Sequence, residues 1–490
     1  MAGEFTLRSL LKSSLLYGLS DILLKLIGFF LVPIYTRVML PEQYGVVGYT
    51  NAVTQVLTPV LGLGIVNCLP MLFFSHQDEA RRRLVSTAIN AVLGFGLLLA
   101  LTLTFFGGPL FALVAPDVPF APYLVITIWV SLFAGFNLLP LGLFNIQNRP
   151  AAYLAFSVGL ALLNVVSALV FVVGMKLGAL GVLYALLVSS GVGLLIALFI
   201  LRRSYLPVID RKLLASLLAL SLPVLPHLLS GTLARFVDRI LLANLSTLAT
   251  TGMYSLALVL ASPVTVIMGA AFAALGPMYY KRAAQDDPAL AEDWSRLGTL
   301  YFLVGALAAL GLSIFSGEVL ALFAPGQYGD ARLLVPLLAV SQLVLGLYWL
   351  ATPAIGHARK TWIYPVASTV TLAIGVICNL LLIPVLGAAG AAWATLASGL
   401  VQLGLFFAYS QRCLRVRYDY RAIGLIALLC YAAFLACSHW WPEGGIVWRV
   451  IGIKLLVLLG AALAALLVAV PASRCLTVLQ GVMRGYRIRD

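Results

Sequence analysis

The chain has 490 residues, of which 62% are hydrophobic and only 10% are charged, and its formal net charge is +14 at pH 7. So apolar a composition excludes a soluble globular protein. The basic surplus is explained by orientation in a membrane and by contact with anionic lipid, so we expect no nucleic-acid partner.

Apolar runs of about 20 residues, the length that crosses roughly 30 Å of hydrocarbon, recur along the whole chain. They predict an all-α integral membrane protein with about 14 transmembrane helices. The expected spans are 14–38, 45–74, 84–114, 119–145, 153–174, 178–201, 213–243, 252–280, 297–315, 333–355, 362–383, 387–411, 421–440 and 447–470.

The distribution of Lys and Arg predicts the orientation of these spans. If the N-terminus is cytoplasmic, most of the 31 basic residues fall in cytoplasmic connections, and the outer connections hold Lys176 and Arg332. We therefore expect both termini to be cytoplasmic. The N-terminus has no short apolar stretch followed by a small-residue cleavage site, so we expect no removable signal peptide.

Two phrases are repeated at one offset. LGALGVLYALLVSS (177–190) is echoed by LGAAGAAWATLASG (386–399), and ALVAP (112–116) by ALFAP (321–325), each 209 residues further on. The repeats pair spans 1 to 6 with spans 7 to 12, which predicts a parallel duplication about an axis along the membrane normal.

The duplication predicts two pseudo-symmetric six-helix lobes around a central cavity, followed by two C-terminal helices. The expected boundaries are 1–205 for the N-terminal lobe, 206–412 for the C-terminal lobe, and 413–490 for spans 13 and 14 with a cytoplasmic tail. A looser echo, YGVVGY (44–49) with TGMYSL (251–256), is offset by 207 residues. We interpret the small residues of the repeated phrases as sites of close helix packing.

Ionisable residues interrupt the first span of each repeat. They are Asp21, Lys25 and Arg37 in span 1, and Arg235, Asp238 and Arg239 in span 7. A charge at the bilayer centre costs about 2.5–3.5 kcal/mol on insertion scales, so these residues need an explanation.

Two interpretations of these charges are open. Intrahelical salt bridges, Asp21 with Lys25 and Asp238 with Arg235 or Arg239, would simply neutralise buried charge. The surplus of cations favours a water-filled cavity for an anionic ligand, because Arg holds phosphate oxygens bidentately.

Other polar residues within spans have more ordinary explanations. Arg449 and Lys454 in span 14 do not share a helix face, and we expect them to snorkel to an interface. Four neutral residues are expected to form helix-to-helix hydrogen bonds. These four are Gln55, Asn164, Gln342 and Asn379.

Signatures of enzymes are absent from the sequence. There is no G-x-x-x-x-G-K-[ST] loop for a nucleotide, the four histidines lack metal-ligand spacing, and the six cysteines form no C-x-x-C pair. The connections between spans are short. We therefore expect a protein that is not an enzyme and that holds no cofactor or metal.

Three stretches carry a resemblance to a known family. They are GFFLVPIYTRVMLPEQYGVVGY (28–49), LPVLPHLLSGTLARFVDRILLA (222–243) with TTGMYSLA (250–257), and CNLLLIPVLGAAGAAWATLASG (378–399). They are similar to polysaccharide flippases of the Wzx type, which belong to the multidrug, oligosaccharidyl-lipid and polysaccharide exporter superfamily. The resemblance extends over spans 1 to 12.

The resemblance implies a function. A flippase of this type would carry oligosaccharide repeat units linked to undecaprenyl pyrophosphate across the bacterial inner membrane by alternating access, for O-antigen, capsule or exopolysaccharide synthesis. It implies that Lys25, Arg235, Arg239 and Arg37 contact the substrate. The expected partners are the lipid-linked glycan, membrane lipids, and the polymerase and other assembly proteins.

The coupling of transport to an ion or proton gradient would need carboxylates within the membrane. Asp21 and Asp238 are the candidates, because burial lets a carboxyl group titrate near neutral pH.

Three alternatives stay open. Drug and cation antiporters of the same superfamily usually have twelve spans and acidic cavity residues. Lipid II flippases for peptidoglycan share fourteen spans and a cationic cavity, but their arginine in spans 2 and 8 is missing here, where Asn51, Gln55 and Asn67 are the polar residues of span 2. A scaffold within a polymer-synthesis complex would make the cavity charges dispensable.

Overall fold

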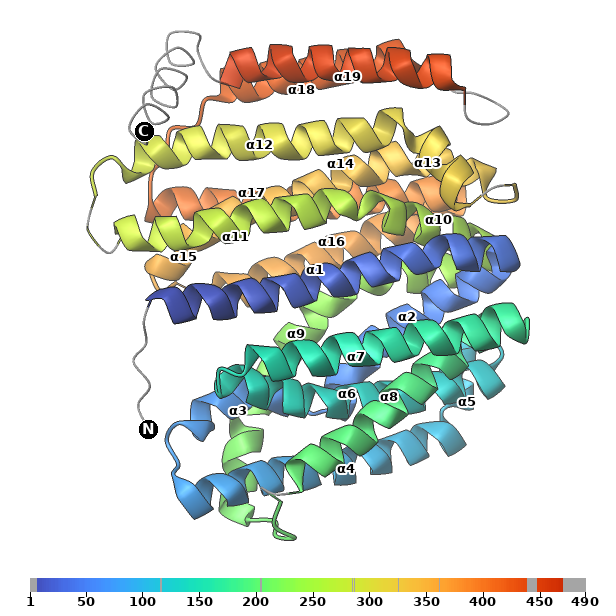
Figure 1. Ribbon diagram of the computed structural model, residues 1–490, viewed down its shortest axis with the longest axis vertical. Helices are drawn as coiled ribbons and strands as arrows, with labels where there is room; N and C mark the ends of the chain where they lie inside the picture. The colour runs from blue at the N-terminus through green and yellow to red at the C-terminus, as the bar shows by residue number, and fades with distance from the viewer. Residues whose placement is uncertain are drawn as a thin grey trace, which may run out of the picture. The chain divides into compact units, whose positions relative to one another are not determined.

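A computed structural model describes residues 7–114, 117–202, 205–283, 285, 287–324, 326–360, 362–438 and 447–469. The side chain of Asp21 and the basic residues of the tail, 470–490, lie outside the described residues. Within the described part, every regular element is a helix (Figure 1).

The first half of the chain begins with the 32-residue helix α1. Its elements are α1 (Leu7–Val38), α2 (Pro41–Leu61), α3 (Ile65–Phe73), α4 (Asp78–Phe106), α5 (Gly108–Val114), η1 (Phe120–Leu124), α6 (Val125–Ile146), α7 (Pro150–Ala168), η2 (Leu169–Gly174) and α8 (Ala179–Leu201).

The second half repeats this order and adds two helices. Its elements are α9 (Arg211–Leu245), α10 (Leu248–Ala261), α11 (Pro263–Ala283), α12 (Leu290–Ile314), α13 (Ser316–Phe323), η3 (Gly329–Leu333), α14 (Leu334–Leu347), η4 (Tyr348–Ala351), α15 (Thr352–His357), α16 (Ile363–Leu386), α17 (Ala388–Cys413), α18 (Tyr420–Ser438) and α19 (Trp448–Ala469).

The predicted number of spans is confirmed. Thirteen helical segments of the described residues are long and apolar enough to cross a membrane, and they correspond to predicted spans 2 to 14. The 32-residue helix α1 covers span 1. The chain is therefore a multi-pass helical membrane protein.

Several predicted spans are divided by a break in the helix. The span expected at 45–74 separates into α2 and α3 because Leu63 and Gly64 adopt left-handed backbone conformations. Only glycine adopts that conformation at little cost, so Gly64 permits the break. The span at 84–114 likewise ends as α4 near Gly107 and continues as the short helix α5.

The duplication is visible in the element boundaries. Helices α6 and α14 begin at Val125 and Leu334, and α8 and α17 begin at Ala179 and Ala388, 209 residues apart in each case. The short element η1 recurs as η3 at the same offset, and α5 recurs as α13, with starts 208 and ends 209 residues apart. The repeated ALVAP and ALFAP phrases thus mark the same short helix in each repeat.

The glycines of the longer repeated phrase are needed for conformation and close packing. Gly178 and Gly387 both have φ of +57° immediately before a helix. A Cβ at Gly181 would lie 3.0 Å from the backbone of Phe171, and one at Gly390 would lie 2.3 Å from the Leu382 carbonyl oxygen. The interpretation as a site of close helix packing is confirmed.

The chain folds into two compact units that do not follow sequence order. Unit 1 contains residues 1–256 and 372–391, and unit 2 contains residues 257–371 and 392–490. The lobe boundaries after residues 205 and 412 stay predictions. They follow the sequence repeat, whereas the two units are defined by contacts between residues.

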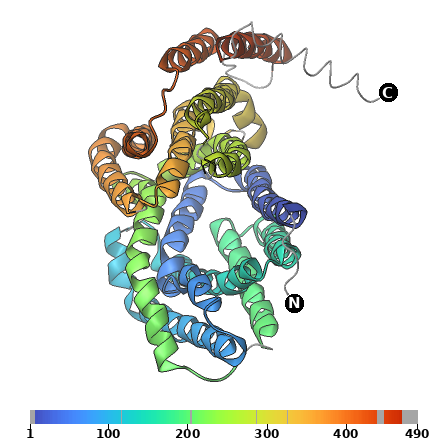
Figure 2. The same ribbon diagram turned by 90° about the vertical axis from the view of Figure 1, so that its left-hand side faces the viewer.

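Unit 1 is organised around α6. This helix packs against α2, α4 and α8, while α8 packs on α7, and α7 in turn contacts α1 (Figure 2). Helix α9 lies against α2, α3 and α4. The first half of the duplication and the lead helix of the second half therefore share one packed core.

Unit 2 is organised around α12. This helix packs against α11 and α14 on one side and against the two C-terminal helices on another. Helices α18 and α19 lie side by side and share a buried cluster with α12 that includes Leu310, Ile314, Cys437 and Ala461 (Figure 1).

Candidate functional site

The span-7 charges stand on α9, a helix that is fixed at its start. The Asp210 carboxylate caps the helix by accepting hydrogen bonds from the backbone N–H groups of Lys212 and Leu213, at 2.9 and 3.2 Å. The backbone N–H of Asp210 donates to the Thr87 hydroxyl of α4 at 3.2 Å. The start of α9 is thus tied to the first half of the chain.

Asp238 is buried in unit 1 and its carboxylate has two donors. The Tyr254 hydroxyl of α10 donates a hydrogen bond to Oδ2, and the backbone N–H of Arg239 donates to Oδ1 at 2.8 Å. Both Asp238 and Tyr254 are buried. This contact connects α9 to α10 across the turn between them.

The intrahelical salt bridges proposed for span 7 do not form. Among the ion pairs of the described residues, none joins Asp238 to Arg235 or Arg239. The partner of the acid is Tyr254, which sequence reasoning missed. Tyr254 lies in the TGMYSL stretch that echoes YGVVGY, but this echo does not indicate that the tyrosine hydroxyl binds Asp238.

Arg239 is a buried cation whose Nε has no hydrogen-bond partner. The side chain is 8% exposed, and its guanidinium lies 5.0 Å from the centre of the Phe236 ring. Its charge also acts on buried Tyr44 of α2. A buried guanidinium N–H without an acceptor destabilises the folded protein, and an additional acceptor would remove that cost.

The other predicted substrate residues are exposed. Arg235 lies one turn before Arg239, while Lys25 and Arg37 lie on α1, which packs mainly on α7 rather than on α9. The charges of α1 and of α9 therefore have different principal neighbours. The prediction that Lys25, Arg37, Arg235 and Arg239 contact one ligand stays a prediction.

Helices α2 and α10 meet at a contact that reproduces the sequence echo. A Cβ at Gly45 would lie 1.9 Å from the Leu248 carbonyl oxygen, and one at Gly252 would lie 2.0 Å from that of Pro41. Gly45 and Gly252 are equivalent at the offset of 207 residues, and so are Pro41 and Leu248. Each glycine therefore faces the equivalent carbonyl group of the other helix. Such reciprocity defines a local two-fold axis between the duplicated helices.

The expectation that Lys454 snorkels is wrong. Lys454 is 1% exposed, and its Nζ lies 2.6 Å from Oε1 of Glu318, which is 8% exposed. Lysine snorkels only when its chain can reach water, and here a buried carboxylate on α13 is nearer. Arg449, by contrast, is exposed.

The neutral polar residues divide into two groups. Thr265 donates to Gln342 between α11 and α14, and Asn164 donates to the Ser189 hydroxyl of α8 at 3.4 Å, so both helix-to-helix bonds are confirmed. Asn379 instead donates to the Gly375 carbonyl of its own helix at 2.7 Å. Its expected link to another helix is not among the described hydrogen bonds.

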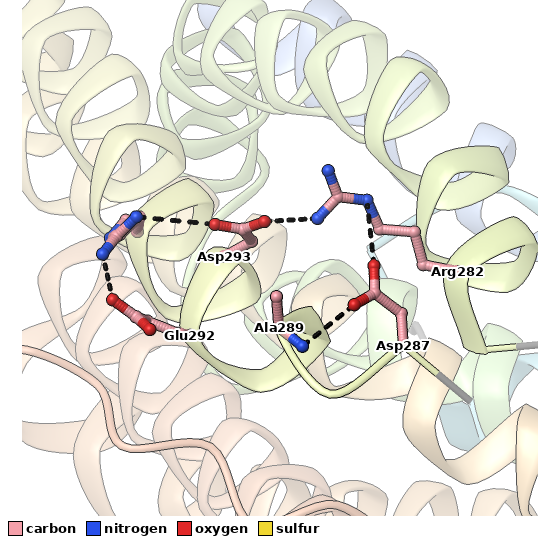
Figure 3. Close-up of polar contacts among 6 residues, drawn as sticks. Arg282, Asp287, Ala289, Glu292 and Asp293 are labelled. Carbon is pink, nitrogen blue, oxygen red and sulfur yellow. Dashed lines mark hydrogen bonds and ion pairs between the residues drawn. The ribbon is translucent and has the colours of Figure 1, made fainter. Parts of the chain in front are cut away.

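A second ionic cluster joins the predicted cytoplasmic ends of α11 and α12 in unit 2 (Figure 3). Arg282 pairs with Asp293 and lies 3.9 Å from Asp287, and Arg296 pairs with Glu292 and lies 3.6 Å from Asp293. All five side chains are partly or largely exposed. The cluster links the two helices, and its three acids outnumber its two arginines, so it is a poor candidate for a site that binds an anionic ligand.

Metal-binding chemistry has no obvious location. Within the described ranges, no group of three or more His, Cys, Asp and Glu side chains is arranged to hold a metal ion. Among the described residues, the buried charged side chains belong to the Asp238–Tyr254–Arg239 group in unit 1 and the Glu318–Lys454 pair in unit 2.

Two solved structures share the fold of this chain. The chain is similar to the lipid II flippase MurJ in an inward closed conformation, with a TM-score of 0.74 and 14% identity over 93% of this chain and 98% of that one. It is also similar to a multidrug resistance MATE family transporter of the MOP superfamily in an inward-facing conformation, with a TM-score of 0.63 and 17% identity over 79% of this chain and 94% of that one. The chain therefore shares the fold of these two structures.

The sequence places the chain more narrowly. Residues 10–281 match the Polysacc_synt family, described as "Polysaccharide biosynthesis protein", and the chain belongs to this family. No curated protein sequence gives a significant match. The resemblance to polysaccharide flippases of the exporter superfamily is confirmed.

Proposed function

We propose that the protein is a flippase that carries oligosaccharide units linked to undecaprenyl pyrophosphate from the cytoplasmic to the outer leaflet of the bacterial inner membrane. The family supports a role in polysaccharide synthesis, and the fold supports transport by a membrane carrier rather than catalysis. The orientation with both termini cytoplasmic is part of this proposal.

Buried Arg239 is the observation that carries the proposal. Its guanidinium has one unpartnered donor within the membrane span, and the acid beside it is already bound by Tyr254. A pyrophosphate or an acidic sugar supplies the acceptor that Arg239 lacks, because guanidinium and phosphate oxygens match in geometry. Exposed Arg235, Lys25 and Arg37 are proposed as further contacts.

Alternating access is the mechanism that we propose for these contacts. The cations bind the anionic headgroup from the cytoplasmic leaflet, while the polyprenyl tail stays in lipid. Exposure to the outer side then releases the headgroup. Asp21 and Asp238 are the proposed coupling carboxylates, and at Asp238 a proton or cation would compete with the Tyr254 hydroxyl.

The test is transport by Arg239 variants in vesicles that contain the lipid-linked oligosaccharide. Arg239→Ala is expected to lower the initial rate roughly 10- to 100-fold, which corresponds to the loss of a charged hydrogen bond. Arg239→Lys keeps the charge but not the fork and should be intermediate. Lys212→Ala, an exposed cation at the start of the same helix, is the matched control.

Membrane abundance and thermal stability are measured for each variant. Transport at the wild-type rate by a correctly inserted Arg239→Ala protein would exclude Arg239 from the substrate site.

A lipid II flippase for peptidoglycan is the second candidate. The similarity to the lipid II flippase extends over 93% of this chain, more than the similarity to the multidrug transporter. Growth of a strain depleted of its own lipid II flippase would favour this candidate, whereas restored polymer export in a polysaccharide flippase mutant would favour the first. Resistance to several cationic drugs on expression would favour an antiporter.

A further inference from the structure

The two C-terminal helices lie outside the part of the chain that matches the family, which ends at residue 281. Helix α19 has the sequence WRVIGIKLLVLLGAALAALLVA, which is almost entirely apolar and rich in leucine and alanine. Apolar contacts change little when such a helix slides along its neighbours by one residue. They therefore define its position along those neighbours only weakly. In lipid there is also little hydrophobic drive to hold two helices together.

One polar contact interrupts this apolar surface. Lys454 of α19 reaches Glu318 of α13, and the Nζ–Oε1 distance is 2.6 Å in a site where both side chains are buried. Phe315 lies beside the pair, with its ring centre 5.9 Å from Nζ. Cys437 of α18 is buried in the apolar cluster against which Phe315 packs. Elements α12, α13, α18 and α19 therefore all meet at this pair.

The other polar atoms beside the pair are buried as well. The second carboxylate oxygen of Glu318 is buried without a hydrogen-bond partner, and so is the hydroxyl of Ser316. A buried ion pair is stable only while its two charged groups stay in contact, because separating them leaves each charge buried without a partner. Sliding α19 by one residue would break the contact.

We infer that the Glu318–Lys454 ion pair sets the register of the α18–α19 helix pair against α12 and α13. The two C-terminal helices are thereby a fixed part of unit 2. If the chain transports by alternating access, as proposed above, α18 and α19 move together with α12 during the cycle. The inference itself concerns the folded protein and can be tested without transport.

The experiment measures the separation of α12 and α19 by pulsed electron resonance. Spin labels are placed at Val304 and Leu463, both exposed, in purified full-length protein whose native cysteines have been replaced. The unaltered pair is expected to give one narrow distance distribution. Glu318→Gln or Lys454→Met should broaden or shift that distribution and lower Tm by roughly 6–20 °C.

Two further variants separate register from stability. The neutral, apolar double variant Glu318→Met with Lys454→Met is expected to recover most of the lost Tm while its distance distribution stays broad, because apolar side chains restore the packing but hold the two helices at no particular register. The charge swap Glu318→Lys with Lys454→Glu should restore a narrow distribution. Arg449→Met, which removes an exposed cation from the same helix, is the control and should change neither quantity.

The result that overturns the inference is a narrow, unshifted distribution in the neutral double variant. This variant remains measurable even if the single variants do not fold. Because no step of the experiment depends on substrate, failure here is distinct from failure of the proposed flippase activity.

Discussion

Gly45 of α2 and Gly252 of α10 face each other so closely that neither position has room for a methyl group. Added Cβ atoms would lie 1.9 and 2.0 Å from the facing carbonyl oxygens of Leu248 and Pro41. Gly48 continues the same contact, since its added Cβ would lie 2.2 Å from the Ser255 hydroxyl oxygen. The N-terminal turns of α2 and α10 thus pack backbone against backbone, which requires glycine at both positions.

Gly45→Ala and Gly252→Ala should each lower the free energy of unfolding by about 1–3 kcal/mol, because the new methyl group forces two backbones apart. The double variant should lose less than the sum of the two, since the first substitution already separates the helices. Chemical unfolding of the purified protein measures both effects. Gly94→Ala on α4, where an added Cβ meets nothing within 4 Å, is the control. Equal effects at Gly94 and Gly45 would mean that the crossing is looser than described.

Tyr254→Phe should destabilise the protein by about 1.5–3 kcal/mol, because it leaves a buried carboxylate oxygen of Asp238 without its donor. Asp238→Asn in the Tyr254→Phe background should then cost little more, since the two residues act through one hydrogen bond. A double-mutant cycle on thermal or chemical unfolding gives the coupling energy. Tyr431→Phe, at an exposed tyrosine of α18, should be neutral. A coupling energy near zero would show that the hydroxyl and the carboxylate are independent.

The ionic cluster at the ends of α11 and α12 should contribute little and should depend on salt. Asp293→Asn removes the carboxylate that lies between Arg282 and Arg296, yet the side chains are at least one-third exposed, so the cost should be about 1 kcal/mol or less. At 1 M salt, where the Debye length is about 3 Å, the difference should nearly vanish. Glu79→Gln, which breaks an exposed pair with Arg83, is a comparable control. A large, salt-independent loss would indicate a buried cluster.

The predicted orientation has a direct test by cysteine labelling in a cysteine-free background. Asp330→Cys, in the connection expected to be outside, should react with a membrane-impermeant maleimide in intact cells. Lys360→Cys, in the connection expected to be cytoplasmic, should react only after the cells are permeabilised. Both positions are exposed, so access to the side chain is not limiting. The reverse pattern would place the termini outside and overturn the orientation drawn from the basic residues.

Some features of the site lay within reach of sequence reasoning and others did not. The charges of α9 were identified because ionisable residues are costly in an apolar segment. The partner of Asp238 was missed, since Tyr254 on the next helix has no periodic relation to it. Lys454 was misassigned for the same kind of reason, because its nearest acid, Glu318, is 136 residues away in the chain.

Hydropathy and repetition along the chain are enough to predict a helical membrane protein, the positions of its spans, and a repeat across its first twelve spans that includes the paired glycines Gly178 and Gly387. These are properties along one chain, and hydropathy and repetition record them directly. Three contacts emerge from the folded arrangement alone: Asp238 with Tyr254, Lys454 with Glu318, and Gly45 with Gly252. Those contacts depend on how each helix is rotated and where it crosses its neighbour, and no spacing within a single helix encodes either quantity.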